Sequence, residues 1–207
     1  MKLDPFYLIV DDAAWLSRFL PLGLRLVQLR IKDRSAEEVR RQVVLAKSLC
    51  RAAGACLVVN DYWQVALEED CDLVHLGQSD LDDADVPALK RAGVRIGIST
   101  HSHEELERAL TFAPDYIALG PVYPTTLKVM PWAPQGLARV TEWKGRIGHI
   151  PLVAIGGLTI ERWPGVFEAG ADSAAVVSDV LRHSSPESRA REWIAATREA
   201  CRARVAS

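Results

Sequence analysis

Short, almost uninterrupted apolar runs recur along the chain, with polar segments between them. Runs of this kind are typical of parallel β-strands, which are covered on both faces and therefore carry few polar side chains. The predicted strands are Phe6–Val10, Leu26–Ile31, Ala55–Asn60, Leu73–Gly77, Arg95–Ser99, Asp115–Gly120, Pro151–Gly157 and Ser173–Ser178.

Amphipathic segments separate most of these runs and predict helices. Ser35 and Glu38 form the S-x-x-E pattern that caps a helix, and the apolar stripe continues to Ala53 before Gly54 ends it. Three further helices are predicted, one beginning at the same pattern in Ser102 and Glu105 and two covering Leu81–Ala92 and Pro186–Val205.

Strands that alternate with helices predict a parallel α/β fold. The eight strands and the compact length favour a (β/α)8 TIM barrel formed by residues 1–207 as a single domain. A doubly wound open sheet is the alternative. That fold would place a glycine-rich phosphate loop after the first strand, but Asp11, Asp12 and Ala13 follow it here.

The charge and the termini exclude several classes of partner. The formal net charge of −2 gives no basis for binding nucleic acid or an anionic membrane. The apolar run Phe6–Val10 is too short for a signal peptide, and no run approaches the ~20 apolar residues of a membrane span. The four cysteines lack metal-type spacing. We therefore expect a cytoplasmic protein with reduced thiols, and a local basic site for an anion remains open.

Polar side chains gather where the second strand ends. Alternation along a strand puts Gln28, Arg30 and Lys32 on one face, directed into the barrel mouth. Two cations beside an amide suit a polyphosphate, although an ion pair between strands would also account for them.

Two carboxylates follow the next two strands. Asp61 and Asp80 lie on loops that are neighbours in a barrel. They either form salt bridges or hold Mg²⁺, which prefers one or two carboxylates together with phosphate oxygens. His75, within an apolar strand, is expected to be a core residue. His101 and His103 lack a third ligand, so zinc is not expected.

The last strands end in features of a monophosphate site. Gly156 and Gly157 follow the seventh strand, and a short helix is predicted to begin at Asp179, directly after the eighth strand ends at Ser178, so that backbone N–H groups point at a phosphate. The long polar loop after the sixth strand either closes over a ligand or is an ordinary surface loop. Its polar side chains are Thr125, Thr126 and Lys128.

In these strand ends the chain resembles the thiamine-phosphate synthase family along nearly its whole length. Seven motifs in the right order are far more specific than any one of them. They are Gln28-Leu29-Arg30-Ile31-Lys32-Asp33, Asn60-Asp61, Val74-His75-Leu76-Gly77-Gln78 with Asp80, Gly97-Ile98-Ser99, Gly120-Pro121-Val122-Tyr123-Pro124-Thr125 with Lys128, Ala154-Ile155-Gly156-Gly157 and Val176-Val177-Ser178.

The resemblance implies a transferase that joins 4-amino-2-methyl-5-hydroxymethylpyrimidine diphosphate to a thiazole phosphate, giving thiamine phosphate and pyrophosphate through a pyrimidine cation. It implies Mg²⁺ on Asp61 and Asp80. The other implied site residues hold the pyrimidine diphosphate (Gln28, Arg30, Lys32, Asn60 and Ser99), form the closing loop (Thr125, Thr126 and Lys128) or bind the thiazole phosphate (Gly157, Val177 and Ser178). Of these, Arg30, Lys32, Ser99 and Lys128 are the implied catalytic residues.

One departure concerns the closing loop. The family often has Pro-Thr-x-Thr-Lys, whereas Leu127 stands here in place of the second Thr, so Thr126 or a backbone group would supply that contact. A related thiazole tautomerase and a non-catalytic sensor of the same ligands are the alternative functions. Neither needs the full set of cations and carboxylates. The sequence leaves open whether the chain forms a homo-oligomer and whether the thiazole carries a carboxylate.

Overall fold

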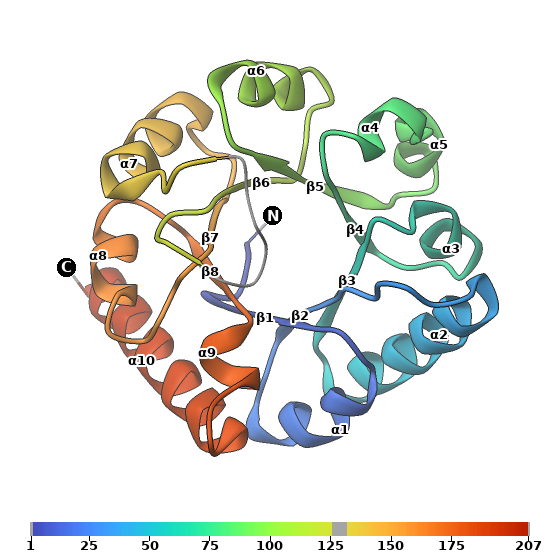
Figure 1. Cartoon of the computed structure of the whole chain (residues 1–207), viewed down its shortest axis with the longest axis horizontal. Helices are drawn as coiled ribbons and strands as arrows, with labels where there is room; N and C mark the ends of the chain where they lie inside the picture. The colour runs from blue at the N-terminus through green and yellow to red at the C-terminus, as the bar shows by residue number, and fades with distance from the viewer. Residues whose placement is uncertain (1, 126–131, 207) are drawn as a thin grey trace.

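The eight predicted strands close into one parallel barrel (Figure 1). The computed structural model describes residues 2–125 and 132–206, with side chains up to residue 202. Each strand pairs with the next along the chain, and β1 pairs with β8 to close the ring, which excludes the doubly wound open sheet. The strands are β1 Phe6–Val10, β2 Leu26–Leu29, β3 Cys56–Asn60, β4 Leu73–Leu76, β5 Arg95–Thr100, β6 Tyr116–Leu119, β7 Leu152–Ile155 and β8 Ser173–Val176.

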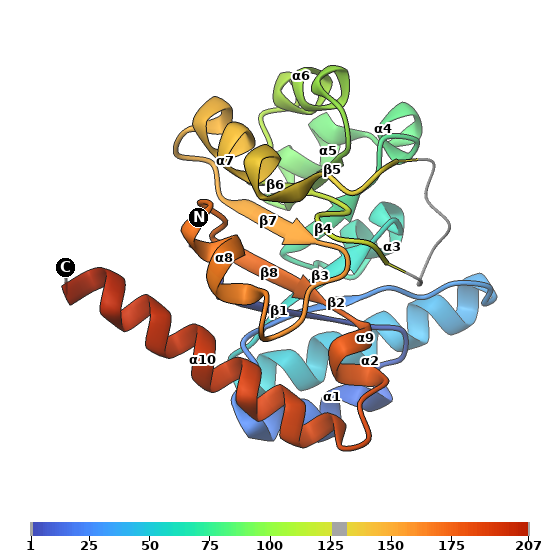
Figure 2. The ribbon, with the colours of Figure 1, turned by 60° about the vertical axis from the view of Figure 1, so that its left-hand side comes forward.

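Helices form a ring around the strands (Figure 1). The long helix α10 extends beyond the rest of the barrel at its C-terminal end (Figure 2). The helices are α1 Ala14–Phe19, the 3-10 turn η1 Leu20–Leu22, α2 Ala36–Ala53, α3 Trp63–Glu68, α4 Asp80–Asp83, α5 Val86–Arg91, α6 His103–Thr111, α7 Gly136–Ile147, α8 Trp163–Glu168, α9 Ser178–Leu181 and α10 Pro186–Ala206.

The predicted helix starts are confirmed by their caps. The Ser35 hydroxyl accepts a hydrogen bond from the Glu38 N–H at 3.3 Å, and Ser102 does the same for Glu105. Gly54, with φ of 64°, ends α2 in the left-handed region that glycine enters without strain.

The single helix predicted over Leu81–Ala92 is wrong, because the structure has two helices there, α4 and α5. The chain leaves the helical conformation at Ala84, and the Asp85 side chain accepts from the Ala88 N–H at 2.8 Å to start α5. Pro87 belongs to the first turn of α5, where its missing N–H costs nothing, whereas in mid-helix it would break the backbone ladder.

Several strands are shorter at their C-terminal ends than the apolar pattern predicts. For example, β2 ends at Leu29 rather than Ile31, and β7 ends at Ile155 rather than Gly157. The residues beyond leave the sheet because they form the loops of the barrel mouth; Gly156, for one, adopts a φ of 96° that a strand does not allow.

Two apolar cores hold the barrel together. The larger one lies between strands and helices, and the smaller one fills the barrel itself. Alternation along the strands divides the side chains between the two. The buried members of the inner core are Leu3, Tyr7, Ile9, Leu26, Val58, Leu73, Tyr116, Ala118, Val153 and Ala175.

Two expectations from the sequence concern the state of the cysteines and the lack of a membrane span. The four cysteines, all within the described residues, are thiols, and Cys50 and Cys71 are buried. Among the residues that the structure describes, no helix has the length and apolarity required to span a membrane.

Candidate active site

The predicted site residues come together at one end of the barrel. All strands are parallel, so their C-terminal ends share one mouth. The described residues there are Gln28, Arg30, Lys32, Asn60, Asp61, Asp80, Ser99, Thr125, Gly157, Val177 and Ser178. The predicted site residues Thr126 and Lys128 lie outside the described residues, as does Leu127.

Lys32, Asp61 and Asp80 form a charged cluster at this mouth. The Lys32 ammonium pairs with the Asp61 carboxylate, which stands just after β3 on a residue with φ of 63°. The Asp80 carboxylate accepts a hydrogen bond from the Gly77 N–H at 2.7 Å. Burial is the main cause that raises the pKa of Asp80, and the negative charge of nearby Asp61 raises it further. The two carboxylates are therefore close enough to repel each other.

Three polar groups beside this cluster have no protein partner within the described residues. The Arg30 guanidinium is half-buried yet forms neither a hydrogen bond nor an ion pair there. The Asn60 amide is buried, and it and Gln28 Oε1 also have no hydrogen-bond partner, although neither group is fully enclosed. Polar groups at such positions are usually satisfied by protein, water or ligand, so these groups are available to a bound molecule.

The two carboxylates fit a hard cation. Within the described residues no group of three or more His, Cys, Asp and Glu side chains is placed to hold a metal. Asp61 and Asp80 would thus supply two ligands, and substrate and water oxygens would supply the rest, which is the arrangement that Mg²⁺ favours.

The two histidines of the His-x-His pattern do not converge on one site. His101 pairs with Glu105 and His103 with Glu142, so the two imidazoles contact different carboxylates.

A chain of hydrogen-bonded side chains crosses the barrel interior beneath the mouth. We call it the polar relay, and it consists of Gln28, Tyr7, Tyr116, His75 and Ser99. Burial lowers the pKa of His75 to about 4, and burial also raises the pKa of both tyrosine hydroxyls, so these three groups are neutral at physiological pH. His75 is the satisfied core residue that the sequence predicts.

Sequence reasoning missed the two tyrosines. Tyr7 and Tyr116 are fully buried inside the barrel, one from β1 and one from β6. The only signal was a hydroxyl-bearing residue within each apolar run, which also fits an ordinary aromatic core position. Gln78 was missed as a support: its amide donates to the Ser99 backbone carbonyl at 2.8 Å and so fixes the end of β5.

The ends of β7 and β8 form the second half of the mouth. Ile155 and Ala175 are the last paired residues of the two strands, and Gly157 and Val177 each follow two residues later in the loops at this end of the barrel. A β-carbon at Gly157 would lie 2.4 Å from the Pro124 carbonyl oxygen, so only glycine lets the loop after β6 approach this closely.

Hydrogen bonds from α10 fix the position of helix α9. The Asp179 carboxylate accepts from the Arg189 guanidinium at 2.9 and 3.0 Å and from the Trp193 indole at 2.7 Å. Both charged side chains are nearly buried, so this pair fixes α9 against α10 and leaves the Ser178 end at the mouth.

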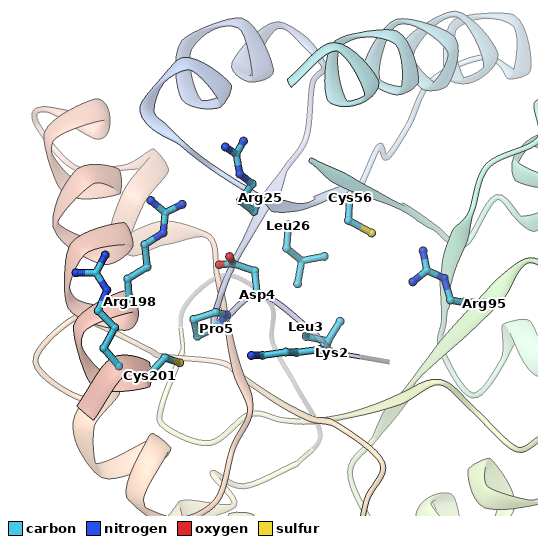
Figure 3. Close-up of a pocket in the computed structure, with 11 residues that line it drawn as sticks. Lys2, Leu3, Asp4, Pro5, Arg25, Leu26, Cys56, Arg95, Arg198 and Cys201 are labelled. Atoms are coloured by element: carbon cyan, nitrogen blue, oxygen red, sulfur yellow. The ribbon is translucent and has the colours of Figure 1, made fainter. Parts of the chain in front are cut away.

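A cavity of about 570 Å³ lies at the opposite end of the barrel (Figure 3). Several cations line it, including Arg25 and Arg198. Burial raises the pKa of the nearby Asp4 carboxylate, and both of these arginines lie near enough to oppose that shift. These two guanidiniums donate to the carbonyls of Ala53 and Gly23. They thereby tie the bottom of the barrel together, where side chains of this fold serve stability. No predicted site residue lines this cavity.

Comparisons with known proteins agree with this geometry. Residues 6–180 match the family described as thiamine monophosphate synthase. A thiamine-phosphate synthase from Rhizobium etli is 58% identical over 197 residues, covering 95% of this chain and 97% of that protein. One from Salmonella newport is 46% identical over 191 residues, covering 92% and 87%. The solved structure of thiamine phosphate pyrophosphorylase from Pyrococcus furiosus has a TM-score of 0.82 at 29% identity, covering 95% and 96%.

The family match covers far more than half of the chain, and each named relative aligns with it over at least 87% of its own length. The resemblance drawn from the strand-end motifs is therefore confirmed, as are the TIM-barrel fold and the expectation of a transferase. The chain belongs to the thiamine monophosphate synthase family.

Proposed function

We propose that the chain catalyses the Mg²⁺-dependent condensation of 4-amino-2-methyl-5-hydroxymethylpyrimidine diphosphate with a thiazole phosphate in the cytoplasm. The products are thiamine phosphate and pyrophosphate. The names of the relatives support the overall activity, while the metal, the roles of single residues and the order of bond changes are part of the proposal.

The observation that carries the proposal is the charged cluster at the ends of β2, β3 and β4. Lys32 and the half-buried Arg30 supply positive charge, and Arg30 has no acidic partner within the described residues. Asp61 and Asp80 supply the ligands for a divalent cation. Mg²⁺, when bound, would neutralise the negative charge of the pyrophosphate leaving group.

The second anion is assigned to the other side of the mouth. The thiazole phosphate would bind to the backbone at Gly157 and Val177 and to the Ser178 hydroxyl. The pairing of β7 with β8 supports this assignment, because the three residues directly follow the ends of these neighbouring strands. The two substrates would then approach each other across the mouth.

The reaction breaks one bond and forms one. The C–O bond between the pyrimidine methylene and the diphosphate breaks, and pyrophosphate leaves with the electron pair. The pyrimidine amino group stabilises the resulting cation, and the thiazole nitrogen donates its lone pair to form the C–N bond. Because no proton is transferred in either step, the site needs electrostatic stabilisation rather than a strong base. Arg30 and Lys32 would provide it.

Exclusion of water is the remaining requirement. Water would capture the pyrimidine cation in competition with the thiazole, so the mouth must close during the reaction. We assign closure to the loop after β6, with contacts from Thr125, Thr126 and Lys128. The tight packing of Gly157 against Pro124 supports an approach of this loop to the thiazole side.

The direct test mixes the purified chain with both substrates and Mg²⁺, then follows thiamine phosphate by oxidation to fluorescent thiochrome. We expect product in the complete mixture and none when EDTA is added or either substrate is left out. Product that is insensitive to EDTA would contradict the metal. Binding of thiazole phosphate without any product would instead indicate the tautomerase or the sensor.

A further inference from the structure

We infer that the polar relay fixes the hydrogen-bonding polarity of Gln28 and Ser99, so that the mouth presents one acceptor and one donor to an aminopyrimidine ring. Tyr7, Tyr116 and His75 act as positioning residues that do not need to touch the substrate. This inference rests on the proposed function for the identity of the ring, but the polarity itself follows from the hydrogen bonds.

The relay is continuous and buried. Gln28 Nε2 donates to the Tyr7 hydroxyl at 2.8 Å, and the hydroxyls of Tyr7 and Tyr116 are 3.1 Å apart. The Tyr116 hydroxyl lies 2.7 Å from His75 Nδ1. His75 Nε2 in turn lies 2.7 Å from the Ser99 hydroxyl. In the part of the chain that the structure describes, the two tyrosine hydroxyls and the imidazole have no other hydrogen-bond partners.

The count of hydrogens sets the direction of the relay. Because Tyr7 accepts from Gln28, the Tyr7 hydrogen can go only to Tyr116. Tyr116 must then donate to His75 Nδ1. His75 therefore carries its hydrogen on Nε2 and donates it to Ser99. With the Gln28 amide in this orientation, any other arrangement leaves a buried hydroxyl hydrogen without an acceptor, which is unfavourable because the group has lost its hydrogen bonds to water.

The two ends of the relay then have opposite roles. Ser99 accepts from His75, so its own hydrogen is directed to a ligand. Gln28 uses its NH₂ group on Tyr7, so its Oε1 atom, which has no partner within the described residues, is left to accept. If the Gln28 amide were turned over, every bond of the relay would reverse, and Gln28 would donate while Ser99 accepted. The relay thus couples its two ends, because turning over the Gln28 amide would also reverse the direction of the Ser99 hydroxyl hydrogen.

This polarity suits an aminopyrimidine. Gln28 belongs to β2 and Ser99 to β5, which are on different sides of the barrel (Figure 1). A ring that satisfies both Gln28 Oε1 and the Ser99 hydroxyl hydrogen offers a donor on one side and an acceptor on the other. The exocyclic amino group is a donor, and the ring nitrogens are acceptors. The amino group would therefore donate to Gln28 Oε1, and a ring nitrogen would accept from the Ser99 hydroxyl.

Ring-nitrogen NMR of histidine measures the direction without any substrate. The His75 signals are assigned by their loss in His75→Asn, and long-range ¹H–¹⁵N spectra at neutral pH then report which nitrogen is protonated. We expect a neutral ring with the hydrogen on Nε2 and a bare Nδ1. A hydrogen on Nδ1, or on both nitrogens, would overturn the direction that we infer.

Kinetics test the positioning role with Tyr7→Phe and Tyr116→Phe, which keep the rings and remove only the hydroxyls. We expect the KM for the pyrimidine diphosphate to rise roughly tenfold, the equivalent of about one hydrogen bond. The KM for thiazole phosphate should change less than about twofold, because that ligand lies on the other side of the mouth. Equal changes in both KM values, or none in either, would overturn the positioning role.

The matched control is Thr100→Val. Thr100 follows Ser99 in β5 but faces outward, is fully buried, and bonds to the Ala118 carbonyl and the Trp143 indole. Its loss should lower stability without changing either KM. If the wild-type chain forms no thiamine phosphate, the proposed function fails, while the NMR result still decides the direction of the relay.

Discussion

The backbone of Gly97 lies directly against the ring of Tyr116. A β-carbon at position 97 would stand 2.0 Å from Tyr116 Cζ, far inside van der Waals contact. Tyr116 is fully buried in the barrel, so its ring has no room to move aside. Because Gly97 has no side chain, the Tyr116 ring fits beside β5, and the Tyr116 hydroxyl lies 2.7 Å from His75 Nδ1.

Gly97→Ala should consequently destabilise the fold by on the order of 3 kcal/mol, at the upper end for overpacking a core. Urea unfolding measures this change. Gly145→Ala is the matched control, because its β-carbon would meet nothing within 4 Å and the residue lies in α7. That control should be neutral or slightly stabilising. Equal effects of the two substitutions would contradict the close packing.

Asp61→Asn should lower kcat by roughly 10²-fold, as loss of one electrostatic contact to a transition state commonly does. Asparagine keeps the shape and tolerates the φ of 63° at this position, so the change removes only the charge. Asp82→Asn is the control, because Asp82 is exposed and its carboxylate pairs with Arg108 rather than with the predicted site residues. Steady-state thiochrome assays compare the two. Near-normal kcat in Asp61→Asn would remove Asp61 from the proposed metal site.

His75 should make the fold sensitive to mild acid. Its folded pKa of about 4 is below the ordinary value of 6.5 because of burial. Between pH 6.5 and about pH 4, His75 is protonated in the unfolded chain but stays neutral in the folded chain. The free energy of unfolding therefore falls as pH drops from 7 to 5, by about 2 kcal/mol from this group.

Urea unfolding of wild type and His75→Asn at both pH values isolates that contribution. Groups common to the two proteins cancel in the comparison, so the variant should lose less stability between pH 7 and 5. An equal loss in both proteins would show that His75 titrates normally in the fold.

Ser178→Asp should raise the KM for thiazole phosphate strongly, because it puts a negative charge where a phosphate is proposed to bind. The KM for the pyrimidine diphosphate should change far less. Ser184→Asp is the control, because it adds the same charge at an exposed position between α9 and α10, outside the proposed phosphate site. If both variants behave like wild type, the monophosphate binds elsewhere.

Local sequence signals predicted the scaffold well where one physical cause dominates. Buried parallel strands need apolar side chains on both faces, and S-x-x-E patterns cap helices, so the strand order and the starts of α2 and α6 followed directly. The break between α4 and α5 was missed because Asp85 and Pro87 act together at a cap, and the apolar pattern alone runs through them.

Side chains at strand ends were predictable because a parallel barrel brings those ends together, as with Lys32 and Asp61. Contacts across the barrel interior were not predictable from the sequence. Tyr7 and Tyr116 are 109 residues apart in sequence, and only the closed ring of strands brings their hydroxyls within 3.1 Å. No local pattern distinguishes them from aromatic residues that merely fill a core.

The most direct test of the whole account is a crystal structure of the protein with thiamine phosphate, pyrophosphate and Mg²⁺. We predict the cation between Asp61 and Asp80, the aminopyrimidine between Gln28 and Ser99, and the monophosphate at Ser178. Ligand density at the opposite end of the barrel, in the cavity beside Arg25 and Arg198, with none at the strand ends, would contradict the account.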